Sequence, residues 1–291
     1  MAKYFEKVSR LRIHTPLILL ALFLGLALTG CQTEEGVLKL TEHKKQELEG
    51  TRKKSLEIKT PLSLEDFQGE PKEWGEQVTG VKTFFETDQK EMALTFDACG
   101  GPYGSGYDET LISFLRAERI PATLFVNERW IRENEDIFLQ LAADPLFQIE
   151  NHGSEHLPLS VSGREAWGIT GTRSAEEIYD EIMDNHKRVK ELTGREMTFF
   201  RSGTAFYDEI AVELAEALGY TVVNFDILGD AGASFSKGQV KEALLNAQPG
   251  SIALLHMNQP ASETAQGVIE AIPLLQEQGF QFVHLKDKQL K

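Results

Sequence analysis

From about residue 81 to the C-terminus, short apolar runs alternate with amphipathic segments, and this alternation constrains the fold more than any other feature of the chain. The apolar runs are typical of buried strands, and the segments between them carry apolar residues at helical spacing. Strands are expected at 91–96, 121–127, 147–153, 197–203, 220–227, 250–257 and 280–285. Helices are expected at 107–120, 135–145, 174–194, 207–219, 237–248 and 264–279. Regular β/α alternation predicts parallel strands, in either a barrel or a doubly wound sheet.

Polar residues at the carboxyl ends of the expected strands favour the barrel. Active sites of β/α barrels are built where the strands end, whereas an open sheet concentrates such residues at one switch point. The sequence therefore predicts an α/β fold, an irregular (β/α) barrel. The polar residues that follow the strands are Asp97, His152, Arg201, Asp226 or Asp230, and His256.

Residues 1–30 resemble a bacterial lipoprotein signal peptide. A basic stretch precedes the apolar run 16–28, which is shorter than the about 20 residues that a membrane span needs but suits a signal-peptide core. The run ends in Leu-Thr-Gly-Cys, which resembles a lipobox, so we expect a lipidated Cys31 that holds the protein at a membrane. The alternative is an ordinary signal peptide with a chance cysteine. Gln32 is not the aspartate that signals inner-membrane retention, so in a cell with two membranes we expect the periplasmic face of the outer membrane.

The remaining chain divides into a polar tether, residues 31–80, and a globular domain, residues 81–291. The net charge of −15 and the isoelectric point near 5.0 argue against a nucleic-acid partner. The chain has 2 cysteines. With Cys31 lipidated, Cys99 has no partner for an intrachain disulfide, so it is a reactive group, a ligand or a small packed residue.

Three histidines and an arginine are the first candidates for a site. His152 and His156 have the spacing H-x-x-x-H, and a helical turn there would project both rings to one side, where they could bind a metal. Two loop histidines that face solvent are the alternative. His256 ends an apolar strand, as a general acid or base often does, or as a packed core histidine does. Arg201 follows a buried strand and needs a carboxylate partner, since an unpaired buried charge is costly; Asp97 is the first candidate.

Five segments resemble, in order, the motifs of the polysaccharide deacetylases with a NodB-type domain (carbohydrate esterase family 4). The resemblance runs from about residue 92 to residue 285 and implies the barrel fold of that family. "LTFDACGG" resembles T-F-D-D-G, and "NHGSEH" resembles N-H-(S/T)-x-x-H. "FFRSGTAFYDE" is similar to the F-R-x-P-Y-G motif, "VVNFDILGDAG" to W-x-x-D-x-x-D-W, and "GSIALLHMN" to G-(S/A)-I-x-L-x-H-D.

The resemblance implies a metal-dependent hydrolase that removes N-acetyl groups from amino sugars of a cell-envelope or exported polysaccharide. Amides are poor electrophiles, so a Lewis acid has to polarise the carbonyl group. The family's metal ligands match His152 and His156, and the expected ion is a divalent metal, most simply zinc. The catalytic residues implied are Asp97 as base, Arg201 holding that base, His256 as the acid that protonates the leaving amine, and Asp230 orienting the acid.

Three positions depart from the family pattern. Ala98 stands where the family usually has a third metal ligand, an aspartate. Thr204 replaces a tyrosine whose backbone amide helps to stabilise the oxyanion, and Ala231 replaces a tryptophan of the pocket wall. Some family members space the two acidic positions two apart, which would put Cys99 in the ligand position; a thiolate with two imidazoles is a sound zinc set. The alternative is a small packed residue beside a two-histidine or metal-free site.

Two further segments are expected near the site. The glycine-rich stretch 100–108 lacks the G-K-(S/T) of a phosphate loop and is interpreted as a flexible rim. Trp167, in the insertion 160–174, would stack on a sugar if exposed, or anchor its loop. Two other functions stay open: hydrolysis of other non-peptide C–N bonds in small amides, and glycan binding by a lipoprotein whose catalytic site has decayed.

Overall fold

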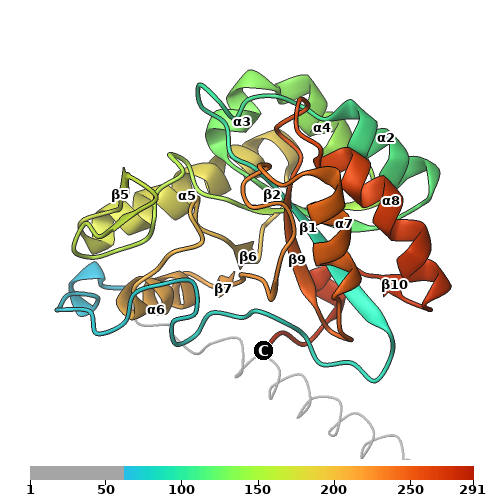
Figure 1. Cartoon of the computed structure of the whole chain (residues 1–291). Coiled ribbons are helices and arrows are strands. Elements are labelled where there is room, and N and C mark those ends of the chain that lie inside the picture. Colours follow the sequence, from blue (N-terminus) through green and yellow to red (C-terminus); the bar gives the residue numbers. More distant parts are fainter. Residues whose placement is uncertain (1–61) are drawn as a thin grey trace, which may run out of the picture. The chain divides into compact units, whose positions relative to one another are not determined.

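Eight strands form one sheet in which every pairing is parallel, as the alternation predicts (Figure 1). The computed structural model describes residues 62–291. The order of the strands is β7-β6-β3-β2-β1-β9-β8, with β10 paired to β1. The strands are β1 (Glu91–Ala98), β2 (Ala122–Val126), β3 (Phe147–Asn151), β6 (Phe199–Phe200), β7 (Thr221–Val222), β8 (Ile227–Leu228), β9 (Ile252–His256) and β10 (Gln281–Phe282).

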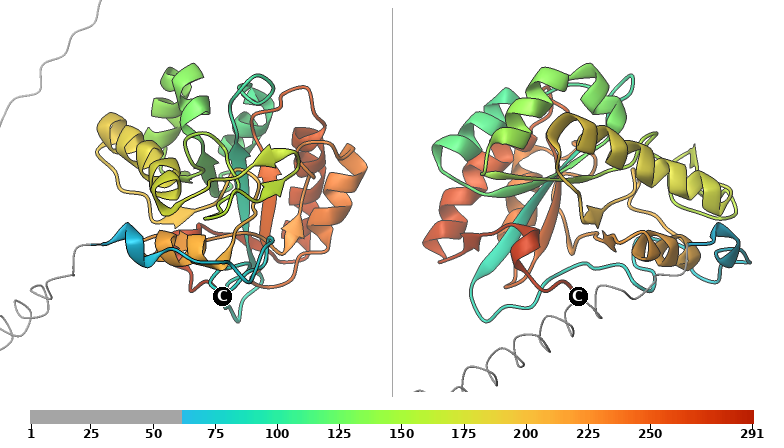
Figure 2. Two further views of the ribbon diagram at one scale, coloured as in Figure 1. Left: turned by 90° about the vertical axis from the view of Figure 1, so that its left-hand side faces the viewer. Right: turned by 180° about the vertical axis from the view of Figure 1, so that it is seen from behind.

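Helices lie on the outside of the curved sheet in all three views (Figures 1 and 2). They are α2 (Glu109–Ala117), α3 (Glu128–Glu133), α4 (Glu135–Ala143), α5 (Ala175–Thr193), α6 (Glu209–Ala217), α7 (Lys237–Leu245) and α8 (Thr264–Glu277). Two 3₁₀ helices, η1 (Leu64–Asp66) and η2 (Leu285–Asp287), and a small antiparallel hairpin of β4 (Glu165–Ala166) and β5 (Ile169–Thr170) complete the elements. The prediction of an irregular (β/α) barrel is confirmed.

Alternate residues of each strand enter two different cores. Met92, Leu94, Phe96 and Ala98 of β1 pack in the larger cluster with the apolar sides of the helices. Ala93 belongs to the smaller cluster, which fills the inside of the barrel with residues such as Phe125 and Leu254 from β2 and β9. Because successive strand residues point to opposite faces, Thr95 and Asp97 share the inner face with Ala93. The carboxyl end of β1 therefore delivers Asp97 to the barrel mouth.

The barrel is open between its last two strands. β7 and β8 end the sheet and do not pair with each other in the part of the chain that the structure describes. The chain at 82–85 lies across part of this interval: Lys82 bridges Val223, and Phe84 bridges Ser251. Phe85 is buried in the inner core. This segment therefore runs along the opening of the sheet, from the carboxyl end of β7 to the amino end of β9.

Several elements differ from the sequence prediction. The strand expected at 220–227 is broken into β7 and β8, because the Asn224 amide group between them donates to the carbonyl oxygens of Glu76 and Ala205. Helix α3 and the hairpin of β4 and β5 were not expected. Helix α5 matches closely: Ser174 caps its first turn through Glu177 N, and Gly194 ends it at φ 71°.

Residues 62–80 pack against the barrel, although the sequence pattern assigns them to the tether. Glu209 of α6 accepts hydrogen bonds from the backbone N–H groups of Lys72 and Glu73 at 2.6 and 2.9 Å. Val78 is buried in the larger core, and Gly75 bridges Tyr207. Residues 62–80 therefore belong to the same compact unit as the barrel.

The signal peptide and the residues 31–61 of the tether lie outside the described residues. Between residues 62 and 291, no helix has the length and apolar character needed to cross a membrane.

Candidate active site

Asp97 is held at the barrel mouth by Arg201, which is completely buried. One guanidinium nitrogen, Nη1, donates to Asp97 Oδ1 at 2.8 Å and to Thr95 Oγ1 at 2.9 Å. The other donors reach the carbonyl oxygens of Val223 at 3.1 Å and Asn224 at 3.0 Å, and the guanidinium stacks 4.2 Å from the Phe125 ring centroid. Through these hydrogen bonds Arg201 fixes Asp97 Oδ1. The other carboxylate oxygen, Oδ2, is on the side of His152.

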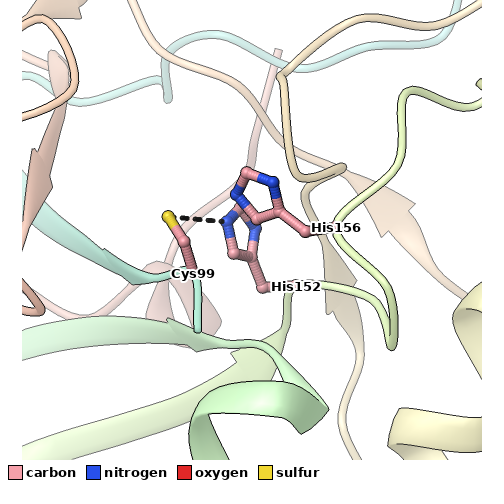
Figure 3. A group of neighbouring side chains, drawn as sticks. All are labelled: Cys99, His152 and His156. Carbon is pink, nitrogen blue, oxygen red and sulfur yellow. Dashed lines mark hydrogen bonds between the residues drawn. The ribbon is translucent and has the colours of Figure 1, made fainter. Parts of the chain in front are cut away.

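Cys99, His152 and His156 form a cluster whose ligand atoms all lie within 4.8 Å of one another (Figure 3). Cys99 Sγ is 3.8 Å from His152 Nε2, and Asp97 Oδ2 is 3.6 Å from the same nitrogen. His152 Nδ1 lies 3.0 Å from the Arg201 carbonyl oxygen, which can accept only if Nδ1 carries the proton. That tautomer leaves the Nε2 lone pair facing Cys99, as a metal ligand requires.

This cluster fits a divalent metal. His156 Nε2 is buried and has no hydrogen-bond partner among the described residues. One thiol and two imidazoles are the soft and borderline donors that zinc prefers, and three protein ligands are what catalytic zinc sites use. Cys99, His152 and His156 are therefore the residues that could hold the divalent metal that the family resemblance implies.

A loop, and not a helical turn, brings the two histidines together, so the helical premise for the H-x-x-x-H spacing is wrong. His156 has a left-handed backbone, φ 64°, and its ring lies 5.1 Å from that of His152. Glu181 of α5 accepts hydrogen bonds from Glu155 N and Leu157 N at 2.8 and 3.1 Å and so fixes the loop. A Cβ at Gly203 would lie 2.4–2.5 Å from atoms of His156, so the loop depends on a glycine there.

His256 and Asp230 form the second ion pair of the site. His256 Nδ1 lies 2.8 Å from Asp230 Oδ1, and His256 N donates to Asp230 Oδ2 at 2.7 Å. Asp230 is fully buried and also accepts a hydrogen bond from Thr264 Oγ1 at 3.0 Å. Asp226, the other aspartate considered for this place, is not at the site; it accepts from Ser251 Oγ and Ile252 N, both at 2.7 Å.

The charges of the site set the two catalytic candidates in opposite protonation states. Burial opposes ionisation of Asp97, but Arg201, then His152 and His256, outweigh it and hold the pKa of the carboxyl below its usual value. Burial would lower the pKa of His256, but Asp230, and after it Cys99, raise this pKa well above the ordinary value. A carboxylate base next to an imidazolium acid is the pairing that acid–base hydrolysis uses.

The Cys99 thiol is also easily ionised. Burial would raise its pKa, but interactions with the His156 and His256 rings lower the pKa to about 6. The thiolate is the form that binds metals.

A pocket of about 840 Å³ lies over this cluster and collects the unsatisfied polar atoms of the described residues. Of the five buried side-chain polar atoms that lack a partner, four belong to residues lining the pocket, and they are Arg129 Nε, His156 Nε2, Thr204 Oγ1 and Asn258 Oδ1. Buried polar groups are normally hydrogen-bonded. Their concentration here indicates a ligand rich in polar groups.

Aromatic side chains stand at the mouth of the same pocket. Trp167, between β4 and β5, is 75 % exposed and packs edge-on against Phe206 with centroids 5.7 Å apart. Tyr103, in the glycine-rich stretch 100–108, is 91 % exposed and also lines the pocket. Trp167 is thus available to a ligand and does not merely anchor its loop, and the glycine-rich stretch forms part of the rim.

The departures from the family pattern fall into two groups. Ala98 is fully buried in the core between sheet and helices, on the opposite side of β1 from Asp97, while Cys99 lines the pocket. Thr204 and Ala231 also line the pocket, and Phe225 and Leu228 contribute the apolar wall near Ala231. The missing aspartate at 98 therefore leaves no gap in the site.

Several residues of the site escape prediction from the sequence. Arg129 is the second residue after the strand expected at 121–127, so the rule that picked the other strand ends could have found it. Thr95 lies two residues before Asp97 on the same face of β1, and its contact with Arg201 follows from strand periodicity. The sequence around Glu181 and Glu76 gives no indication that either residue lies near the site, because their positions depend on packing between distant segments.

Comparison with known proteins agrees with this geometry. Residues 85–223 match the family model of the polysaccharide deacetylases. A chitooligosaccharide deacetylase from Azorhizobium caulinodans is 26% identical over 217 residues, 70% of this chain and 96% of the relative.

Solved structures share the fold. A family 4 carbohydrate esterase from Bacillus anthracis is 25% identical with a TM-score of 0.56, covering 72% of this chain and 86% of that one. A mutant of BA3943, a family 4 pseudoenzyme of Bacillus anthracis, described as having restored enzymatic activity, is 20% identical with a TM-score of 0.61, covering 73% and 72% of the two chains.

Proposed function

We propose that the protein is a metal-dependent hydrolase that removes N-acetyl groups from amino sugars of a cell-envelope or exported polysaccharide. Residues 85–223 match the polysaccharide deacetylase family, and a family 4 carbohydrate esterase shares the fold. The family and the chitooligosaccharide deacetylase relative support a hydrolase of non-peptide carbon–nitrogen bonds. The observation that carries the proposal is one pocket lined by Asp97, Cys99, His156 and His256. Behind these side chains, Arg201 pairs with Asp97, Asp230 pairs with His256, and His152 completes the cluster with Cys99 and His156.

In this proposal each ion pair has one role. Asp97 accepts the proton of the water that attacks the acetamide carbonyl, and Arg201 keeps the carboxylate ionised and oriented. His256 donates a proton to the leaving amine nitrogen, and Asp230 holds its Nδ1 so that Nε2 is directed away from that carboxylate. A divalent metal on Cys99, His152 and His156, most simply zinc, would supply a Lewis acid for the carbonyl oxygen.

In the proposed reaction, the donor for the oxyanion is the backbone N–H of Thr204, in the turn after Arg201. The Thr204 backbone N–H has no partner among residues 62–291, and the residue lines the pocket. Preorganised backbone N–H groups stabilise the charge that develops on a carbonyl oxygen. Replacement of the family's tyrosine by Thr204 leaves this role intact, because a backbone amide carries it.

Catalytic decay is not favoured by the structure of the site. The main sequence argument for decay is Ala98, and this residue belongs to the apolar core and not to the pocket. A functional site with Cys99 as the third metal ligand is supported by the ligand atoms of Cys99, His152 and His156, which lie within 4.8 Å of one another.

Acetate release tests the proposal. The full-length protein should release acetate from N-acetylated oligosaccharides, chelator treatment should stop the release, and Asp97→Asn should reduce it by about 10²-fold or more, as loss of a general base does. Release that is the same in Asp97→Asn would overturn it. Turnover of small amides only would support the alternative C–N hydrolase, and glycan binding without turnover would support the decayed site.

A further inference from the structure

Arg129 lies in the wall of the active-site pocket and has no role in the reaction described above. It is the second residue of α3. A Cβ at Gly101 would lie 3.3 Å from Arg129 Cζ and 3.4 Å from each terminal nitrogen, so the guanidinium rests against this glycine. A Cβ at Gly100 would lie 2.7 Å from Arg129 Cβ. The glycine pair after Cys99 therefore makes the space that Arg129 occupies.

The Arg129 charge is unpaired within the described residues. No carboxylate among residues 62–291 lies within 4.0 Å of this guanidinium. Its side-chain contact is the Cys99 carbonyl oxygen, 3.3 Å from Nη2, and its Nε is buried without a partner. Arg132, on the same short helix, pairs with Glu128 at 3.6 Å and Glu155 at 3.3 Å.

This isolation is unusual in a chain with 45 acidic and 30 basic residues. Among the described residues that line the pocket, Glu76 is the one other charged residue without an ion-pair partner. Its carbonyl oxygen accepts a hydrogen bond from Asn224, which follows β7. Arg129 and Glu76 do not form an ion pair. A partly buried guanidinium without a carboxylate is costly, so a ligand group is its natural partner.

The contact with Cys99 sets where that ligand group lies. Because Nη2 donates to the backbone oxygen of Cys99, the Arg129 guanidinium lies beside the Cys99–His152–His156 cluster in the same pocket, next to the place that the proposed function gives to the acetamide. A guanidinium binds planar oxyanions through parallel N–H···O bonds and prefers carboxylate and phosphate to neutral groups. Resting on the proposed deacetylase function, we propose that Arg129 forms an anion subsite and that the substrate is an acidic glycan, with a carboxylate next to the N-acetylated carbon or on the adjoining sugar.

Binding to the full-length Asp97→Asn protein tests the subsite without turnover. Four tetrasaccharides serve as probes: neutral chitotetraose; an N-acetylglucosamine–N-acetylmuramic acid oligomer with free carboxylates; the methylamide of that oligomer; and an N-acetylglucosamine–glucuronic acid oligomer. At least one of the two acidic oligomers should bind about tenfold to a hundredfold more tightly than chitotetraose, as expected for hydrogen bonds to a charged group. Tighter binding of the muramic acid oligomer would place the carboxylate next to the N-acetylated carbon. Tighter binding of the glucuronic acid oligomer would place it on the adjoining sugar.

Arg129→Met should abolish the preference for acid and leave chitotetraose binding within about twofold, whereas Arg129→Lys should keep part of the preference as a point charge. Arg132→Met, on the same helix, is the matched control and should keep the full preference. Equal loss for neutral and acidic probes in Arg129→Met, or no preference in the parent, overturns the subsite. If acidic glycans bind more tightly but the wild-type protein releases no acetate from them, only the proposed function is contradicted. If the wild type releases acetate equally from neutral and acidic glycans, and Arg129→Met does not change this, only the subsite is contradicted.

Discussion

Ala98 and Cys99 are neighbours that face opposite sides of the barrel wall. β1 runs through Ala98, which pairs with Val126 and whose carbonyl oxygen accepts from Asn127 N at 3.0 Å. Strand alternation then directs Asp97 and Cys99 toward the pocket and Ala98 into the core between sheet and helices. The ligand position of this chain is therefore 99, and an alanine at 98 is what the core requires.

Ala98→Asp is accordingly expected to damage the protein and not to repair it. The carboxylate would be buried among apolar side chains, which should reduce the free energy of unfolding by about 3 kcal/mol or more. Urea unfolding measures this loss. The double variant Ala98→Asp/Cys99→Ala should also fail to bind metal, whereas Cys99→Asp should still bind it. Metal binding restored by the aspartate at 98 would show that the strand ends earlier than Ala98.

Glu181 is a residue whose ionisation should be visible in stability. Burial raises the pKa of its carboxyl to about 6 against a reference value of 4.5, although hydrogen bonds from Glu155, Leu157 and Ser154 partly offset this. The folded chain then binds a proton that the unfolded chain releases between pH 4.5 and 6. This contribution to stability is present below that window and is lost as the pH rises through it.

The comparison with Glu181→Gln isolates this titration, because glutamine does not ionise. The free energy of unfolding of the wild type, relative to Glu181→Gln, should be larger at pH 4.5 than at pH 7 by up to about 2 kcal/mol. Urea unfolding of both proteins at both pH values measures the difference. An identical difference at the two pH values contradicts the raised pKa.

At the scale of elements, the loop after β3 is the part of the site that depends most on distant contacts. Its shape needs Gly153 at φ 79°, Glu181 from α5 and the absence of a side chain at Gly203 after β6. These three elements meet only when β3 and β6 pair, through Asn151 and Phe200. The position of His156 is therefore a property of the assembled sheet.

Gly203→Ala should displace His156 and lower metal content well below that of the wild type. The added Cβ would lie 2.4–2.5 Å from Cγ, C and Cα of His156, and backbone atoms cannot move aside cheaply. Gly238→Ala is the control: its Cβ meets nothing within 4 Å in α7, and it should gain about 0.5–1 kcal/mol of stability with unchanged metal content. Full metal binding in Gly203→Ala would contradict the described loop.

The sequence predicted the long elements well and the short ones poorly. β1, β9, α5 and α6 carry clear periodicity, and their ends lie close to the expected ones. The two-residue strands β7 and β8 and the six-residue α3 owe their place to tertiary contacts such as those of Asn224. Short segments bury too little surface to be specified locally, so their patterns do not reveal them.

The candidate site divides in the same way. Asp97, Arg201, Asp230, His256, His152 and His156 come together in the structure, and strand ends and the family resemblance had indicated them all. The place of Cys99 could not be predicted, because it depends on β1 continuing to Ala98, two residues beyond the expected strand end. The place of Arg129 after an expected strand could be read from the sequence, but the absence of a carboxylate beside it is visible only when every neighbour is known. The catalytic roles of these residues remain predictions.

At the scale of the whole molecule, we propose that a lipid on Cys31 anchors the barrel domain to a membrane of the cell envelope. Its support is the order of basic stretch, apolar run and Leu-Thr-Gly-Cys in residues 1–31. In cells fed radiolabelled palmitate, the wild type and Cys99→Ser should take up label, and Cys31→Ser should not. An unlabelled wild-type protein would leave an ordinary signal peptide as the explanation of this segment.

The central claim is that Cys99 is a metal ligand beside a functional acid–base pair, and cobalt substitution tests it most directly. Thiolate bound to Co²⁺ produces a charge-transfer absorption band in the near ultraviolet, which nitrogen and oxygen ligands do not. The full-length wild type loaded with one equivalent of Co²⁺ should show this band, and Cys99→Asp should bind cobalt and lack it. Identical spectra for the two proteins would contradict the claim.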